Sequence, residues 1–557
     1  MLFIAPSLGL TAVLIGAVLP SLLLIYGFTR FYAARAKFLR LQKAGSEVPS
    51  GYSFLWGHLG LIASLKSQHP PDAITDVAVA QLARDFPGGL FYLDFWPFSY
   101  GHLVIASGQV AAQMEKHEVD LPHGDDIDKP LDVMCGGRSL VTMSGDVWRQ
   151  WRKLFNSSFS ERNMLEMAAG IAREVEMFCG KLRERAGSGE VFELEQLTAD
   201  LTMDVIGSMA LGTRLCHQHK ENPLAADLRT QADWIAFNPI MGPWKRWRAM
   251  WSPSFRQRNR RIRDYVGKEL DKRFAELQDP TSSTRSSKSI ISHALANYLE
   301  TTTSRATNNE KPVPLEPTFR KTLTSQTLLF LTGGHETTST TLIFIYHNLS
   351  TSPTSLSRLR AEHTAVFGPC TSPSHILSLL ASSPELLSQL PFTLAVIRET
   401  LRLYPPAGGI RVGSPLVNLV DDNGKVFPTA GLKIWTNHLA IHRNPRDWKD
   451  PHRFWPERWL AREGEAEIEM APKKGAWRPF EWGPRSCLGQ TLAMMELRIV
   501  LLMTAREFDI KPAYAEDAER VWGSQAYMTA GKGVGAKPNA GYPCTVGFAS
   551  KGDGRSG

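Results

Sequence analysis

The N-terminal segment differs from the rest of the chain in its lack of charge. Residues 1–29 contain no Asp, Glu, Lys or Arg, and Leu8 to Phe28 is predominantly apolar. About 20 apolar residues are enough for a helix to cross a bilayer. Basic residues follow at once: Arg30, Arg35, Lys37, Arg40 and Lys43. Because such bases stay in the cytosol, the pattern predicts a transmembrane signal anchor (1–29), a basic linker (30–50) and a cytosolic domain (51–557).

A cleaved secretory signal peptide is the alternative for this segment. Ala34-Arg35-Ala36 is a poor cleavage site, and no basic stretch precedes the apolar residues. The apolar stretch is also longer than a signal peptide requires. We therefore favour a single-pass anchor.

Three later stretches have the pattern of helices. Leu323 to Ile345 is long and apolar, with Gly333-Gly334 near its middle, whereas Phe392 to Leu403 and Thr491 to Leu502 contain no Gly or Pro. The length and apolar character of the first stretch, and the absence of Gly and Pro from the other two, favour helices. Residues 279–289 and 301–314 are polar and rich in Ser, Thr, Asn and Pro, which predicts loops before the first of these helices.

Three tryptophans recur at i, i+3 and i+7 among basic residues: Trp244, Trp247 and Trp251. Basic amphipathic segments of this kind lie on membrane surfaces. A core-facing aromatic stripe with solvated arginines explains the pattern equally well. The sequence does not decide between the two interpretations.

Composition narrows the class of protein. The 557 residues are 43% hydrophobic, enough for one large core, and no internal repeat is apparent. The net charge of +8 suits contact with anionic lipid and an acidic electron donor. The basic residues are dispersed without a nucleic-acid module, so no nucleic-acid partner is expected. Six cysteines without paired spacing argue against a disulfide scaffold or a zinc site.

One of these cysteines lies in a distinctive loop. Cys487 falls within Phe480-Glu481-Trp482-Gly483-Pro484-Arg485-Ser486-Cys487-Leu488-Gly489, directly ahead of the helical stretch from Thr491. A nearby positive charge and a helix N-terminus both lower a cysteine pKa, and we expect Arg485 to supply that charge. Glycines at 483 and 489 permit close backbone approach. The segment is suited to present a thiolate to iron, and a buried inert cysteine in a tight turn is the alternative.

The segment resembles the haem-binding signature of the cytochrome P450 family at five positions: Phe480, Gly483, Arg485, Cys487 and Gly489. The resemblance covers nearly the whole chain after residue 50 and is strongest to fungal microsomal members of secondary metabolism. It implies a mainly α fold with small β-sheets, and haem b with the Cys487 thiolate as iron ligand. In this family the thiolate pushes electron density toward O–O cleavage.

Two further segments are similar to elements of this family. They are Glu399-Thr400-Leu401-Arg402 and Phe454-Trp455-Pro456-Glu457-Arg458-Trp459. The i, i+3 spacing places Glu399 and Arg402 on one helix face. The resemblance implies that Arg458 joins them in a structural triad that retains haem. Trp459 stands where Phe is more usual. Without the resemblance, an exposed ion pair of under about 1 kcal/mol would be expected.

The apolar helix from Leu323 to Ile345 contains Gly333-Gly334-His335-Glu336-Thr337-Thr338, which is similar to the family's oxygen-activating element. Each mid-helix glycine costs about 1 kcal/mol relative to alanine, so the pair calls for a reason. Missing side chains would make room for oxygen, and an opened helical ladder could hold water. The resemblance implies that Glu336 and Thr337 relay protons. A glycine-notched packing helix is the alternative.

Haem propionates require basic partners. Trp148 and Arg152, one helical turn apart, resemble the family's Trp-x-x-x-Arg element, and Arg411 and Arg485 occupy further propionate-binding positions. The substrate should contact four segments: Leu121 to Ser144, Phe330 to Glu336, Ala407 to Ile410 and Gln525 to Ala530.

The resemblance implies a monooxygenase of the endoplasmic reticulum membrane that oxidises a lipophilic substrate with O2. About 70 residues follow Cys487, too few for a flavin domain, so electrons should come from a separate NADPH-cytochrome P450 reductase. Fungal secondary metabolism is the preferred pathway, and fatty-acid or alkane hydroxylation is the second; both rest on analogy. A reductase-independent haem-thiolate isomerase or dehydratase and a membrane-tethered haem sensor remain alternatives.

Overall fold

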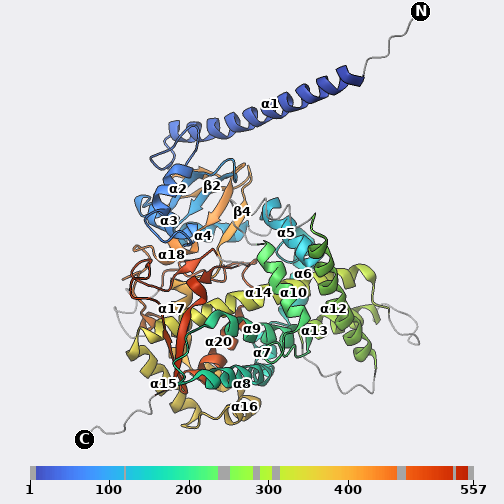
Figure 1. Cartoon of the computed structure of the whole chain (residues 1–557), viewed down its shortest axis with the longest axis vertical. Coiled ribbons are helices and arrows are strands. Elements are labelled where there is room, and N and C mark those ends of the chain that lie inside the picture. Colours follow the sequence, from blue (N-terminus) through green and yellow to red (C-terminus); the bar gives the residue numbers. More distant parts are fainter. Residues whose placement is uncertain are drawn as a thin grey trace, which may run out of the picture.

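A computed structural model describes residues 8–117, 121–235, 251–279, 289–303, 314–460, 472–530, 533 and 535–549. Within these ranges the chain is mainly helical with small sheets, as the sequence predicts (Figure 1). The helices are α1 (Leu8–Lys43), α2 (Leu59–Lys66), α3 (Thr75–Leu82), α4 (Gly108–Gln113), α5 (Asp125–Cys135), α6 (Gly145–Asn156), α7 (Glu161–Glu166), α8 (Ala168–Arg185), α9 (Leu194–Leu211), α10 (Pro223–Ile235), α12 (Pro253–Gln278), α13 (Ile290–Thr303), α14 (Pro317–Ser350), α15 (Pro353–Phe367), α16 (Pro373–Ser382), α17 (Pro391–Leu403), α18 (His438–His442) and α20 (Gln490–Thr504).

The largest sheet has the strand order β1-β2-β7-β4. β1 (Leu90–Asp94) and β2 (Gly101–Ile105) are antiparallel, β2 and β7 (Lys433–Thr436) are parallel, and β7 and β4 (Gly409–Val412) are antiparallel. The remaining strands form three smaller sheets: β3 (Phe192–Glu193), β11 (Pro543–Phe548) and β8 (Phe508–Pro512); β9 (Met528–Thr529) and β10 (Lys537–Pro538); β5 (Asn418–Val420) and β6 (Val426–Pro428).

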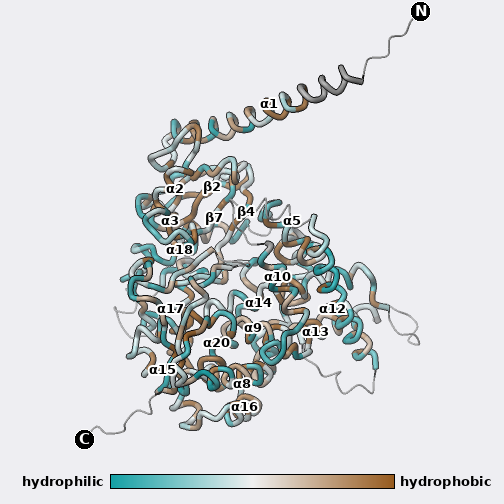
Figure 2. The backbone as a smooth tube through the Cα atoms, viewed as in Figure 1, coloured by the Kyte–Doolittle hydropathy of each residue, from teal (hydrophilic) through white to brown (hydrophobic). Residues whose placement is uncertain are grey.

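α14 passes through the middle of the molecule (Figure 1). It is longer than predicted because Pro317 occupies its first turn and the Glu316 carboxylate accepts the Thr318 and Phe319 N–H groups at 2.9 and 2.7 Å. The helix continues unbroken through Gly333 and Gly334, so the expected opening of its ladder is not seen. α12 lies at the periphery and is mostly hydrophilic (Figure 2).

α1 extends away from the rest of the molecule (Figure 1) and continues to Lys43, through much of the predicted linker. Its later part packs against the large sheet: Arg35 is fully buried and forms an ion pair with Asp94, and Phe38 joins the sheet's core. Within the described part of the chain, no helix is both long and apolar enough to cross a membrane. The structure therefore does not support the predicted span.

Two other predictions fall largely beyond the described ranges. Trp244 and Trp247 lie outside them, and Trp251 is 67% exposed. The predicted loops at 279–289 and 301–314 are described only at their ends, where residues 301–303 belong to α13 rather than to a loop.

Candidate functional site

The cysteine loop ends directly before α20, whose N-cap is Gly489. The Cys487 N–H donates to the Phe480 carbonyl at 2.8 Å, which closes the loop on itself. Gly483 has φ of +80°, and a Cβ there would lie 3.0 Å from Glu115 Cβ. Because this conformation disfavours other residues, Gly483 is required for the turn that carries the thiol.

Cys487 has an unusual environment. Its side chain is accessible, yet burial among surrounding atoms is the largest influence on its thiol and raises the pKa. The Gly489 and Gln490 amides and the Arg152 charge oppose that effect. An accessible group that is surrounded by protein faces an internal space. The sequence assigned the nearby charge to Arg485, which was wrong: Arg152 supplies it, and alone it does not overcome burial.

Arg485 instead reaches back to the segment before α6. Its Nη1 donates to the Leu140 carbonyl at 3.0 Å and its Nη2 to the Met143 carbonyl at 2.6 Å. The Leu140 amide, in turn, donates to Gln326 Oε1 of α14 at 2.8 Å. The Arg485 guanidinium also lies 4.4 Å from the Trp148 ring centroid. One short segment therefore links the cysteine loop to the central helix.

Three basic side chains meet at one corner of this region. The pKa of His123 lies well below its ordinary value because of burial first and then the charges of Arg411, on β4, and Arg485. His123 is therefore neutral beside two guanidinium groups. The Asp128 carboxylate lies 3.8 Å from His123 Nδ1, and the two guanidinium groups suit a further anion. Sequence reasoning missed His123, since a single histidine in a loop carries no distinguishing pattern.

Arg152 contacts the cysteine loop directly. It is on α6, one turn after Trp148, and its Nη1 donates to the Ser486 carbonyl at 2.8 Å. The structure therefore places Arg152 against the cysteine loop, where its charge acts on the thiol.

The two glycines of α14 have different structural surroundings. A Cβ at Gly334 would lie 2.8 Å from Ile206 Cγ1, so this glycine permits close packing against α9. A Cβ at Gly333 would meet nothing within 4 Å, and Gly333 is exposed although most of α14 is buried. Open space therefore lies beside the helix at Gly333, one turn before Thr337.

Glu336 and Thr337 are neighbours on α14 but have different surroundings. The Thr337 hydroxyl donates to the Gly333 carbonyl at 2.9 Å, beside the open space. Glu336 is buried, with Oε1 3.9 Å from Lys537 Nζ and 3.9 Å from His335 Nε2. Lys537 lies on β10, where its closer ion pair is with Glu195 Oε1 at 2.9 Å. It was not predicted, because nothing in its local sequence indicates a contact with α14.

The triad side chains are brought together as a buried network. Arg402 Nη2 is 2.8 Å and Arg458 Nε 3.1 Å from Glu399 Oε1, and all three residues are buried. Burial alone would raise the pKa of Glu399, but the charges of Arg402 and Arg458 hold it below its ordinary value. The Trp459 indole N–H donates to Glu399 Oε2 at 2.9 Å, a bond that the more usual Phe could not make.

A second buried carboxylate steadies the cysteine loop. Glu481 Oε1 lies 2.8 Å from His438 Nε2, and its Oε2 lies 2.8 Å from Arg478 Nη2. Against the effect of burial, His438 and then Arg478 lower its pKa to about 2. A Cβ at Gly409 would lie 2.3 Å from the Glu481 carboxylate, so β4 needs glycine there. Glu481 fills a variable position of the motif, which is why sequence reasoning missed it.

These features fit a haem group. A thiol facing an internal space, a central helix with an open face at Gly333, and a corner with two guanidinium groups match its iron, its distal side and its propionates. The arrangement defines the class of haem-thiolate oxidoreductases. The family model for cytochrome P450 matches residues 73–530, and the chain belongs to that family. It is accordingly a monooxygenase, of a family that uses O2 and a redox partner on small molecules.

The chain is similar to fungal proteins over almost its full length. It is 34% identical to cytochrome P450 monooxygenase polC of Polytolypa hystricis, covering 93% of this chain and 92% of that protein. It is 29% identical to cytochrome P450 monooxygenase acrF of Aspergillus aculeatus, covering 86% and 99%. Among solved structures, the cytochrome P450DA haem domain has a TM-score of 0.68 at 19% identity, covering 90% of this chain and 97% of that one.

Proposed function

We propose that this chain is a membrane-anchored haem-thiolate monooxygenase that oxidises a lipophilic small molecule in fungal secondary metabolism. The accessible thiol of Cys487, enclosed by protein before α20, is the observation that carries the proposal. Haem b bound there would supply oxygen activation. Electrons come from NADPH through a separate NADPH-cytochrome P450 reductase, and the fungal relatives support the pathway.

In this proposal each predicted residue has a defined task. Cys487 would be the iron ligand, and the positive charge of the haem iron would keep its sulfur ionised. Trp148, Arg152, Arg411 and Arg485 would bind the propionates, and Arg152 also holds the cysteine loop through Ser486. The open face at Gly333 would leave room for oxygen beside α14. The triad of Glu399, Arg402 and Arg458 retains haem by fixing α17 to the segment around Trp455.

Replacing the proposed ligand tests the site. We expect Cys487→Ala to lose the red-shifted Soret band of the reduced carbon monoxide complex, because no thiolate remains for iron. Cys370→Ala is the matched control, since Cys370 is also accessible, and it should keep the band. If Cys487→Ala kept a parent-like spectrum, the ligand assignment would be wrong.

The proton relay is assigned to Thr337 and Glu336. The Thr337 hydroxyl can exchange its bond to the Gly333 carbonyl for one into the open space, and Glu336 can replenish the proton from the Lys537 side. We expect Thr337→Ala to raise peroxide release per NADPH roughly tenfold or more.

Thr341→Ala is the control for this experiment, because Thr341 makes the same backward bond one turn later, to the Thr337 carbonyl at 2.8 Å. Equal peroxide release by parent and Thr337→Ala enzymes would reject the relay. Turnover without NADPH or O2 consumption would favour the isomerase or dehydratase alternative over a monooxygenase.

Membrane attachment through α1 is part of the proposal. The helix exposes large apolar side chains, including Leu24 at 74% exposure, alongside Leu19, Leu22, Leu23, Ile25 and Phe28. Contiguous exposed apolar surface of this kind marks an interaction with lipid or protein. We expect the full chain to remain in microsomal pellets after carbonate washing, and release into the supernatant would contradict a single-pass anchor.

A further inference from the structure

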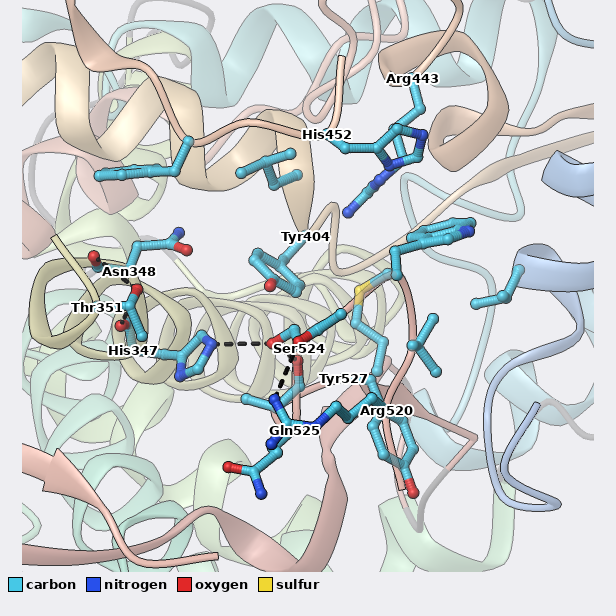
Figure 3. A pocket seen from close by; sticks show the side chains of 18 of the residues that line it. His347, Asn348, Thr351, Tyr404, Arg443, His452, Arg520, Ser524, Gln525 and Tyr527 are labelled. Atoms are coloured by element: carbon cyan, nitrogen blue, oxygen red, sulfur yellow. Dashed lines mark hydrogen bonds between the residues drawn. The ribbon is translucent and has the colours of Figure 1, made fainter. Parts of the chain in front are cut away.

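A second cavity lies apart from the cysteine loop. Its volume is about 320 Å³, and it is lined by the ends of α14 and α17, by residues after α18, and by the 520–528 segment (Figure 3). Neither Cys487 nor the open face at Gly333 contributes to it, although residues 525–528, part of a segment that the sequence predicted to contact substrate, line it. Cavities of about 300–1,000 Å³ are the size that small ligands occupy.

The buried charge in this cavity is Arg443. It is 8% exposed, and Figure 3 shows its side chain among those that line the cavity. Its Nε and Nη1 atoms are buried and make no hydrogen bond within the described part of the chain. Burial lowers its pKa to about 9, which still leaves it charged at neutral pH. A buried cation without hydrogen-bond partners is costly unless something else binds it.

The lining offers Arg443 no counterion. Among the described residues, the lining includes Arg520 at the exposed rim and the imidazoles of His347 and His452, but no Asp or Glu. Burial lowers the pKa of each histidine to about 4, and Arg443 and Arg84 contribute at His452, so both rings are neutral. Arg84 Nη2 lies 2.8 Å from His452 Nε2, which adds another guanidinium behind the wall. The lining is therefore electropositive, and Glu399, beyond the lining, is the carboxylate whose charge acts against burial to raise the pKa of Arg443.

Two aromatic rings flank the guanidinium. Trp522 lies 4.3 Å and Tyr404 5.9 Å from the Arg443 Cζ, measured to the ring centroids. Tyr404 is fixed by stacking on Phe344 at 4.0 Å. The cavity thus combines a cation with flat apolar walls, which suits a planar organic anion better than a free inorganic ion.

The backbone at Trp522 carries strain. Trp522 and Gly523 have φ of +51° and +85° and lie between Val521 and Ser524, whose backbone groups bond each other at 3.0 and 3.1 Å. Positive φ at both central residues is typical of a type I′ turn, which normally takes Asn-Gly. A bulky residue there is an outlier, and such strain concentrates at ligand-binding sites. It places the Trp522 indole on Arg443.

We propose that this cavity binds a small planar organic carboxylate, with its charge on Arg443 and its body against Tyr404 and Trp522. This would be a second ligand site, distinct from the one beside Cys487. The cavity is connected to α14 through Tyr404, which lies two residues before Pro406. The Pro406 carbonyl accepts the Ala536 N–H at 3.0 Å, and the Ala536 carbonyl accepts the Thr340 hydroxyl of α14 at 3.0 Å.

Equilibrium dialysis of the holoenzyme with labelled benzoate tests the site, with benzamide as the neutral molecule of the same shape. We expect one benzoate per haem without a Soret shift, and benzamide at least about tenfold weaker, because a charge-assisted bond is lost. Arg443→Gln should weaken benzoate at least about tenfold. Arg453→Gln, a nearby exposed arginine outside the cavity, should leave it unchanged.

Arg520→Gln provides a second variant that does not disturb the interior, because Arg520 is on the exposed rim. It should weaken benzoate several-fold with an unchanged carbon monoxide spectrum. The proposal would be overturned if benzoate did not bind, if benzamide bound equally well, or if only inorganic phosphate bound. Unchanged benzoate affinity in both Arg443→Gln and Arg520→Gln would overturn it as well.

Discussion

Trp459 illustrates what a single side chain adds to a common framework. Phe is more usual at this position, yet here the indole N–H donates to the buried Glu399 carboxylate at 2.9 Å. A hydrogen bond to a buried charged group contributes about 1.5–3 kcal/mol. We expect Trp459→Phe to lower stability by about that amount, measured as faster loss of the carbon monoxide band on heating.

Trp455→Phe is the control for that comparison. Trp455 bonds Glu399 through its backbone N–H at 2.9 Å, which Phe retains. Equal stability of the parent and the Trp459→Phe enzyme would show that the other donors to Glu399 suffice.

Glu481 makes a prediction about pH. Its pKa in the folded protein is about 2, against an ordinary value of 4.5. A carboxylate with a lowered folded pKa adds stability that is fully present above its unfolded pKa and lost as pH falls toward the folded value. We expect Glu481→Gln to cost about 2–3 kcal/mol at pH 7. The difference from parent should shrink as pH falls from 4.5 toward 2 in denaturant unfolding, and a constant difference would contradict the ion pairing.

At the scale of elements, the two glycines of α14 should respond differently to substitution. Gly334→Val would push Ile206 and α9 away, and overpacking of this kind costs about 1–3 kcal/mol. Gly333→Ala adds a methyl group to open space and gains about 1 kcal/mol of helix propensity. We therefore expect Gly334→Val to unfold at lower temperature, and Gly333→Ala to fold normally but bind azoles more weakly. Matching melting temperatures would refute the distinction.

The sequence predicted the elements better than their contacts. Local patterns identified the helices that became α14, α17 and α20, with errors only in their ends. Contacts between distant segments had no local signal, which is why Lys537 beside Glu336 and His123 beside Arg485 were missed. The local loop pattern, and then the family resemblance, selected Cys487 among six cysteines. The local pattern misassigned the nearby charge, because Arg485 donates to the Leu140 carbonyl instead.

For the whole molecule, the boundary between α1 and the domain is testable by truncation. Removing residues 1–29 should leave a folded haem protein, since the contacts of Arg35 and Phe38 with the domain remain. Removing residues 1–40 would leave Asp94 buried without its arginine, a loss of about 3–5 kcal/mol. The carbon monoxide spectra of the two truncated proteins after mild heating measure how much folded haem protein remains in each. Equal amounts would show that the domain begins after residue 40.

The position of Leu140 has a consequence for how such an enzyme can change its substrate range. Its amide is held by the central helix and its carbonyl by the loop that carries the thiol. A substitution there that displaced this backbone would also disturb the loop that carries the thiol. Evolution and engineering should therefore alter specificity more readily at positions whose backbone does not hold the cysteine loop.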